Sequence, residues 1–371
     1  MTYKKIHCLT SLRFLAAAMI VVHHSRGVLW LTPDHLKHWA LDQAVSFFFV
    51  LSGFVLTYVY PMLGGTLSVK KFYLARFARI WPNHLAAFVA LFVIFLPGSF
   101  YSIKGVNHAS VAMLNILLVH SWIPVREIFF SFNAVTWAVS VEVFFYLLFP
   151  LLIKDFETTY LRKIALSLLL VFGIVSFCNV LHLPSDGAVS PTTISRTALV
   201  YINPPCRLFE FVLGMCVALL WRKHYHHIKL NKIVGTLLEV FAICVVLLSV
   251  YYSISAGNLV RLVGPAGSEY LCHAGSAVAF ASLIFIMAME AGFISKVLNL
   301  KLPVLLGDAS YSIFLFHQII LRFYTVNAGL FSYIPQVLLY IIFLFFLLII
   351  SFLVLIVIER PCRRLLMGFI K

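Results

Sequence analysis

Residues 334–358 read IPQVLLYIIFLFFLLIISFLVLIVI, a run of 25 residues without a charged side chain. A helix crosses a bilayer with about 20 apolar residues, so this stretch predicts a membrane-spanning helix. The whole chain of 371 residues is 62% hydrophobic and 11% charged, whereas soluble domains are about 45–50% apolar and about 25% charged. This composition excludes an ordinary cytosolic enzyme, a disordered protein, a coiled coil and a nucleic-acid-binding domain.

Ten segments in all have the length and apolar character of a membrane span. They are residues 12–30, 42–62, 80–98, 134–153, 162–182, 204–221, 233–254, 270–291, 302–324 and 334–358. The stretch 109–123 is apolar but too short to span, and we expect it to be interfacial or re-entrant. No second soluble domain fits between the segments. The sequence therefore predicts an all-α polytopic membrane protein with one transmembrane domain, residues 1–371.

The net charge of +15 lies mainly in the loops between apolar runs. With ten spans and a cytoplasmic N-terminus, 20 of the 28 Lys and Arg residues fall on the inner side; with 109–123 as an eleventh span, only 12 do. Cytoplasmic loops are enriched in Lys and Arg, so ten spans with both termini in the cytoplasm are favoured. Arg13, His23 and His24 interrupt the first apolar run, which is therefore expected to be a retained span rather than a signal peptide.

The seven cysteines form no CxxC pair and have no metal-ligand spacing with histidine. A disulfide framework and a zinc site are therefore not indicated, and no metal is expected. Cys206 and Cys272 both fall near predicted outer loops. The sequence leaves open whether these two cysteines form a disulfide.

Charged and ionisable residues inside apolar segments are costly and usually face a cavity or a partner. Four of them, from four different segments, are predicted at one depth near the outer side: His24, Glu142, Glu210 and His317. A second group gathers at the inner side: Arg13, Arg76 and Arg79, with Asp308 nearby. The inner group could hold an anion, and the outer group could transfer a proton.

Arg13 and His24 are eleven residues apart, which is close to three turns of a helix. Both side chains then lie on one helix face, about 16 Å apart. A long cofactor with phosphates at one end and a reactive group at the other could lie along that face. Coenzyme A has this shape.

These residues stand in motifs that resemble acyltransferase family 3, the membrane-bound O-acyltransferases of bacterial surface polysaccharides. Arg13-x10-His24 is similar to the first-span signature of that family, and five further stretches follow in the same order along nearly the whole chain. The six stretches are LTSLRFLAAAMIVVHHS (9–25), FFFVLSGFVL (47–56), FYLARFARIWP (72–82), TWAVSVEVFFYLLFP (136–150), RLFEFVLGMCVALL (207–220) and LGDASYSIFLFHQII (306–320).

The resemblance implies an acyl-CoA-dependent O-acyltransferase, with acetyl-CoA as the expected donor on the cytoplasmic side. Arg76 and Arg79 would contact the donor phosphates, which suits the planar guanidinium fork, and Arg13 would help to hold the donor. His24 would act as general base on the acceptor or carry the acyl group, and Glu142 would orient or charge-stabilise it. The acceptor would be a sugar hydroxyl of a surface polysaccharide, such as a lipopolysaccharide O-antigen, or of its lipid-linked precursor.

A supporting role is weighed against simple helix packing for a further set of residues: His23, Glu210, Asp308, Tyr311 and His317. Expected partners are membrane lipids, the glycan acceptor and glycan-synthesis enzymes, but no nucleic acid, in the bacterial cytoplasmic (inner) membrane. The SGNH-type hydrolase domain of some family members is not expected here. The alternatives are a transporter or flippase of an anionic solute or glycan intermediate, and a non-catalytic subunit of a glycan-synthesis complex.

Overall fold

A computed structural model describes residues 5–368, apart from 33, 35, 96–107, 187–192, 226, 227 and 229. Every regular element in this described part is helical. The α-helices are α1 (His7–Ser25), α2 (Ala44–Val59), α3 (Gly65–Ile94), α4 (His108–Ile116), α5 (Arg126–Phe129), α6 (Thr136–Ile153), α7 (Phe156–Val180), α8 (Leu208–His224), α9 (Lys232–Ser253), α10 (Val260–Ala274), α11 (Ala277–Ala288), α12 (Phe293–Leu298), α13 (Lys301–Val326), α14 (Gln336–Val354) and α15 (Arg360–Gly368).

Ten helical stretches of the described chain are long and apolar enough to cross a membrane. Each overlaps one of the ten segments predicted from the sequence, so the expected all-α architecture is confirmed. The apolar stretch 109–123 is covered by the nine-residue helix α4 and the short turn η3 (His120–Trp122), and it provides no eleventh span. The chain is a multi-pass membrane protein.

Helix boundaries differ from the predicted spans where basic residues flank the apolar core. The helix α3 begins at Gly65, so Arg76 and Arg79 lie within it rather than in front of a span that starts at residue 80. Likewise α1 begins at His7, which places Arg13 in its second turn. Hydropathy locates the apolar centre of a helix, but Lys and Arg are good helix formers and do not end it.

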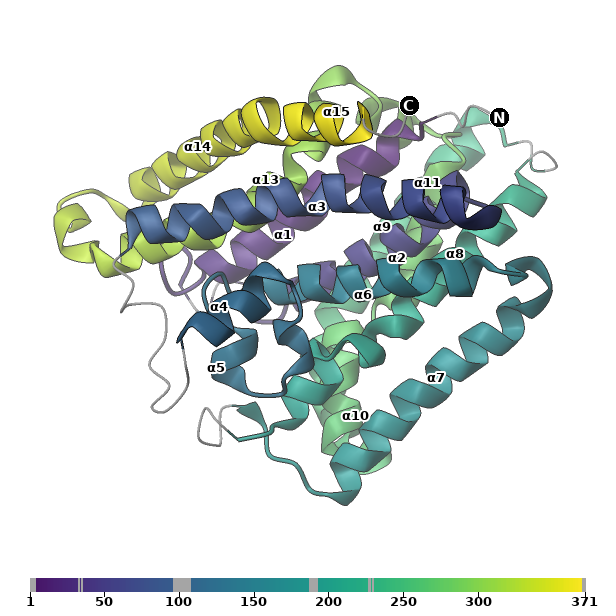
Figure 1. Cartoon of the computed structure of the whole chain (residues 1–371), viewed down its shortest axis with the longest axis horizontal. Helices are drawn as coiled ribbons and strands as arrows, with labels where there is room; N and C mark the ends of the chain where they lie inside the picture. The colour runs from purple at the N-terminus through teal and green to yellow at the C-terminus, as the bar shows by residue number, and fades with distance from the viewer. Residues whose placement is uncertain are drawn as a thin grey trace.

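Figure 1 shows α1 and α15 reaching the same end of the molecule, where the two ends of the chain are marked. We call this the proximal end, and the opposite end, where α1 ends and α2 begins, the distal end. The helices α7 and α14 lie at the edges of the bundle (Figure 1), and much of their apolar surface is exposed. That surface suits contact with lipid chains.

Two helix pairs form the centre of the bundle. The helix α2 packs most extensively against α8, and α1 packs against α13. At the first crossing, a Cβ atom on Gly53 would collide with the carbonyl oxygen of Phe211, and one on Gly214 with that of Val50. At the second, a Cβ atom on Gly307 would collide with the carbonyl oxygen of Thr10. Small residues thus let the backbones approach closely, as is common in membrane helices.

The cysteines whose pairing the sequence left open are both free. Cys206 is buried at the start of the α8 stretch, and Cys272 is half-buried near the end of α10.

Candidate active site

A pocket opens between α1, α2, α3, α6 and α13, with an empty volume of about 890 Å³. Its polar lining includes the guanidinium groups of Arg13, Arg76 and Arg79 and the carboxylate of Glu142. Three cations against one anion give the lining a net positive formal charge. We call it the arginine pocket, and it brings together the three arginines that the sequence analysis grouped.

Arg76 is held in the pocket by aromatic rings. Its guanidinium carbon lies 5.7 Å from the ring centre of Tyr60, 5.9 Å from that of Phe72 and 5.8 Å from that of Tyr146. These contacts fix the cation without neutralising it. Its Nε atom is buried and has no hydrogen-bond partner among the described residues. A buried donor without a partner is costly, so an acceptor atom at this place would stabilise Arg76.

Arg79 is different, because Glu359 bonds to its guanidinium group. The other carboxylate oxygen of Glu359 accepts a hydrogen bond of 2.7 Å from the side-chain amide of Asn83. Arg79 also lies over the ring of Tyr311, 5.9 Å from its centre. The sequence analysis assigned no role to Glu359, which stands beside a basic tail. The available signal was a single acidic residue directly after the uncharged run 334–358.

Glu142 lies in the arginine pocket rather than beside His24. Its Oε1 atom accepts hydrogen bonds from Ser52, at 3.2 Å, and from the hydroxyl of Tyr146 in the next turn of α6. The predicted role of orienting His24 therefore has no support in the geometry. Position along a span gives depth in the bundle, but lateral neighbours depend on how the helices pack.

His24 pairs instead with His317, which is fully buried on α13. Nδ1 of His317 lies 3.2 Å from the carbonyl oxygen of Ile313, which can only accept, so this nitrogen carries the hydrogen. In the neutral ring, Nε2 of His317 then has a lone pair, and Nδ1 of His24 donates to it over 2.9 Å. This assignment from the hydrogen-bond network leaves Nε2 of neutral His24 unprotonated. This nitrogen therefore has a free lone pair.

The arginine pocket and the histidine pair share an aromatic wall. Phe48 and Phe314 line the pocket, and their ring centres are 6.2 Å apart. On its other side, Phe314 lies 6.0 Å from the ring centre of His317. His24 and His317 themselves do not line the arginine pocket, and Phe314 is in contact with both groups.

The other candidate residues are distributed over the molecule. Glu210 is fully buried, with Oε1 2.7 Å from Nη2 of Arg207 and 2.7 Å from the hydroxyl of Ser46. This contact ties α8 to α2, and Arg207 was not singled out from the sequence. Asp308 pairs with Lys5 at 3.4 Å on the partly exposed proximal surface, outside the pocket lining.

Two further candidates lie close to the site. Tyr311 lines the pocket, and its hydroxyl donates to the carbonyl of Ile80 over 3.2 Å. His23 lies beside His24, with ring centres 5.1 Å apart, and its Nδ1 atom accepts from Arg26 over 2.7 Å. No cluster of three or more His, Cys, Asp or Glu side chains in the described part of the chain is arranged to hold a metal ion.

The fold and site define a multi-pass membrane protein with a cationic pocket that adjoins an oriented histidine. The sequence profile described as "Acyltransferase domain" matches residues 6–360. Because this match covers nearly the whole chain, the protein belongs to that acyltransferase family, as the sequence motifs indicated.

Two curated relatives illustrate the similarity. Acyltransferase MdmB from Streptomyces mycarofaciens is 30% identical over 228 residues, which cover 59% of this chain and 58% of the relative. O-acetyltransferase OatA from Staphylococcus aureus (strain NCTC 8325 / PS 47) is 23% identical over 338 residues, which cover 85% of this chain and 50% of the relative. The chain therefore spans about half the length of these relatives. No solved structure matches it significantly.

Proposed function

We propose that this protein is a membrane O-acyltransferase that takes an acyl group from acyl-CoA at the proximal, cytoplasmic end. The acceptor is a sugar hydroxyl of a surface polysaccharide or its lipid-linked precursor, reached from the distal end. Acetyl is the favoured acyl group, since one of the matched relatives is named an O-acetyltransferase. The bacterial cytoplasmic membrane is the proposed location, since acyl-CoA is made inside the cell.

The observation that carries this proposal is the shared wall between a cationic pocket and an oriented base. Arg76, with its unpartnered Nε, and Arg79 suit the phosphates of the donor. Arg13 and His24 are eleven residues apart on α1, which corresponds to about 16 Å along the helix. The pantetheine arm of coenzyme A has a comparable reach, so the thioester would arrive near His24.

The proposed reaction balances with His24 as the only proton carrier. Nε2 of His24 accepts the proton of the acceptor hydroxyl while the oxygen attacks the thioester carbonyl. The carbon–sulfur bond then breaks, and the coenzyme A thiolate receives that proton from the His24 imidazolium. A covalent route through an acyl-His24 intermediate would use the same Nε2 atom.

The test is glycan acylation, measured by mass spectrometry in cells that lack this gene. These cells are complemented with the wild type, with His24→Ala or with His38→Ala at matched membrane levels. His38 is an exposed residue at the distal end and serves as the control. Removal of a general base typically costs 10²- to 10⁴-fold, so we expect an acyl mass increment from the wild type and His38→Ala but not from His24→Ala.

Two results would overturn the proposal. Full acylation by His24→Ala would remove His24 from the mechanism. A glycan without the increment even in wild-type cells would favour a transporter or a non-catalytic subunit.

A further inference from the structure

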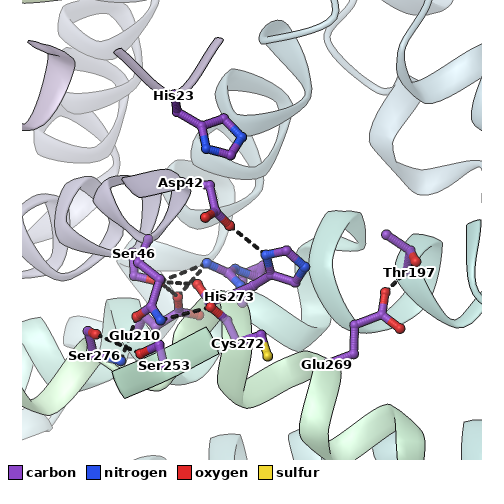
Figure 2. Close-up of polar contacts among 12 residues, drawn as sticks. His23, Asp42, Ser46, Thr197, Glu210, Ser253, Glu269, Cys272, His273 and Ser276 are labelled. Atoms are coloured by element: carbon purple, nitrogen blue, oxygen red, sulfur yellow. Dashed lines mark hydrogen bonds and ion pairs between the residues drawn. The ribbon is translucent and has the colours of Figure 1, made fainter. Parts of the chain in front are cut away.

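A second ionisable pair, which we call the distal dyad, lies at the distal end of the bundle and consists of Asp42 and His273. Asp42 stands in η1 (Leu41–Gln43), just before α2, and His273 stands near the end of α10. Figure 2 shows the two side chains joined, with Oδ2 of Asp42 2.6 Å from Nδ1 of His273. The carboxylate accepts, so Nδ1 carries the hydrogen and Nε2 of the neutral ring has a free lone pair.

The imidazole of His273 is fixed from several sides. The side chain of Gln43 donates to the carbonyl of Cys272 over 2.8 Å and accepts from the backbone N–H of Ser276 over 2.7 Å. These two hydrogen bonds hold the backbone before and after His273. The ring of Tyr201 stacks on the imidazole at 4.0 Å. Burial and the nearby Asp42 carboxylate raise the pKa of Tyr201, so its phenol stays neutral. The imidazole of His273 is therefore held in one orientation, and only its Nε2 edge is left without a partner among the described residues.

That edge is accessible. The side chain of His273 is 27% exposed, and among the described residues none bonds to its Nε2 atom. The dyad is not needed to tie η1 to the junction of α10 and α11, because the two hydrogen bonds of Gln43 already do so. A fixed, accessible imidazole with an unused lone pair is suited to accept a hydrogen bond from a ligand.

The distal dyad also stands close to the proposed base. Figure 2 places His23 on the other side of Asp42 from His273, and the rings of His23 and His24 are 5.1 Å apart. Since Nδ1 of His23 accepts from Arg26, its Nε2–H remains a donor. His23 thus offers a donor, and His273 an acceptor, near the distal end of the bundle.

We propose that the distal dyad is part of the acceptor-binding site, where Nε2 of His273 accepts a hydrogen bond from a hydroxyl group of the sugar acceptor. This inference rests on the proposed function and deepens it by locating acceptor recognition. Sugars offer several hydroxyl groups that both donate and accept hydrogen bonds, which matches the donor of His23 and the acceptor of His273. His273 is here a positioning residue, and His24 remains the base.

Two substitutions at one position separate recognition from structure. In His273→Asn, the amide nitrogen takes the place of Nδ1 and keeps the bond to Asp42, but the outward lone pair is lost. In His273→Gln, the amide oxygen can take the place of Nε2, but the bond to Asp42 is lost. If His273 binds the acceptor, His273→Asn should lose more acceptor affinity than His273→Gln. If His273 has only a structural role, His273→Gln should lose more stability than His273→Asn.

The experiment uses membrane vesicles from a strain that lacks the gene, supplemented with lipid-linked glycan extracted from the same host as acceptor. Labelled acetyl-CoA is the donor, and His38→Asn is the control. We expect His273→Asn to raise the half-saturating acceptor concentration about tenfold, the effect of losing one hydrogen bond. His273→Gln should stay within about threefold. Acetyl-CoA binding and the melting temperature of His273→Asn should match the wild type.

Wild-type acceptor dependence in His273→Asn would overturn the inference, and so would a greater loss in His273→Gln than in His273→Asn. Equal losses of melting temperature or of acetyl-CoA binding in both variants would assign the dyad a structural role and would also overturn it. Failure of the proposed function is distinguishable, because then the wild type itself transfers no label.

Discussion

The side chain of His317 determines which nitrogen of His24 keeps a free lone pair, and under the proposed function that nitrogen is the base. The chain of hydrogen bonds runs from the carbonyl of Ile313 through His317 to Nδ1 of His24. Such an outer partner fixes the tautomer and the ring orientation, a role that a carboxylate often fills elsewhere. Glu142 was predicted for that role, but the side chain that contacts His24 is a second imidazole, that of His317.

Substitution of His317 therefore tests the orientation of His24. In His317→Gln, the amide oxygen can still accept from Nδ1 of His24, and we expect kcat within about tenfold of the wild type. In His317→Asn, that acceptor is lost, and we expect kcat to fall by 10- to 100-fold, as for other orienting partners. The measurement is the initial rate of acyl transfer at saturating donor. Equal rates in the two variants would contradict the orienting role.

Substitution of Arg76 tests whether the arginine pocket binds the acyl donor. Lys keeps the charge but lacks the planar fork and the fit to the three surrounding rings. We expect Arg76→Lys to raise the KM for acyl-CoA at least tenfold with little change in kcat, because donor binding is affected before the chemical step. Lys71→Gln is the control, since Lys71 is exposed on the same helix. An unchanged KM in Arg76→Lys would remove Arg76 from donor binding.

At this scale the sequence located many of the important residues but not their pairing. Arg13, Arg76 and Arg79 meet as predicted, since their motifs place them at one depth. Glu359 reaches Arg79 across 280 residues of chain, and Arg207 meets Ser46 across 161. Contacts of this kind follow from helix packing, which span positions alone do not specify.

At the scale of elements, glycines determine which pairs of helices can pack closely against each other. The crossing of α1 and α13 at Gly307 brings His24 to His317, and the crossing of α2 and α8 at Gly53 and Gly214 supports the pocket and the distal dyad. The ten spans were predictable because apolar length is a local property of the sequence. The partners of each helix, and the extension of α3 to Gly65, were not.

The helix crossing of α2 and α8 can be tested with one methyl group. Gly53→Ala would place a Cβ atom against the carbonyl oxygen of Phe211 and 3.0 Å from the backbone nitrogen of Met215. Such overpacking costs about 1–3 kcal/mol, so we expect a lower melting temperature in detergent and a smaller folded yield. Gly173→Ala is the matched control, since nothing lies within 4 Å of its Cβ position. A wild-type melting temperature for Gly53→Ala would contradict the close crossing.

At the scale of the whole molecule, the distribution of charge predicts the orientation in the membrane. Of the 28 Lys and Arg residues, 20 fall on the predicted inner side when ten spans are assumed. The positive-inside rule then predicts that the proximal end, with the opening residues of α1 and the basic helix α15, faces the cytoplasm. Donor and acceptor would thus approach His24 from opposite sides of the membrane.

Reporter fusions test this orientation. Alkaline phosphatase, which is active only outside the cytoplasm, should be inactive when fused after Lys371 and active when fused after Gly329, between α13 and α14. Green fluorescent protein should give the reverse pattern. Phosphatase activity after Lys371 would reverse the assignment of both ends and, with it, the direction of acyl transfer.

The central claim is that His24 transfers an acyl group from acyl-CoA to a glycan. Its most direct test is the incorporation of label from acetyl-CoA into the glycan acceptors of membrane vesicles, as an alkali-labile ester, by the wild type and by His24→Ala at equal protein levels. The account predicts ester formation by the wild type and a loss of at least 100-fold in His24→Ala. Ester formation at the wild-type rate by His24→Ala, or none by either protein, would contradict it.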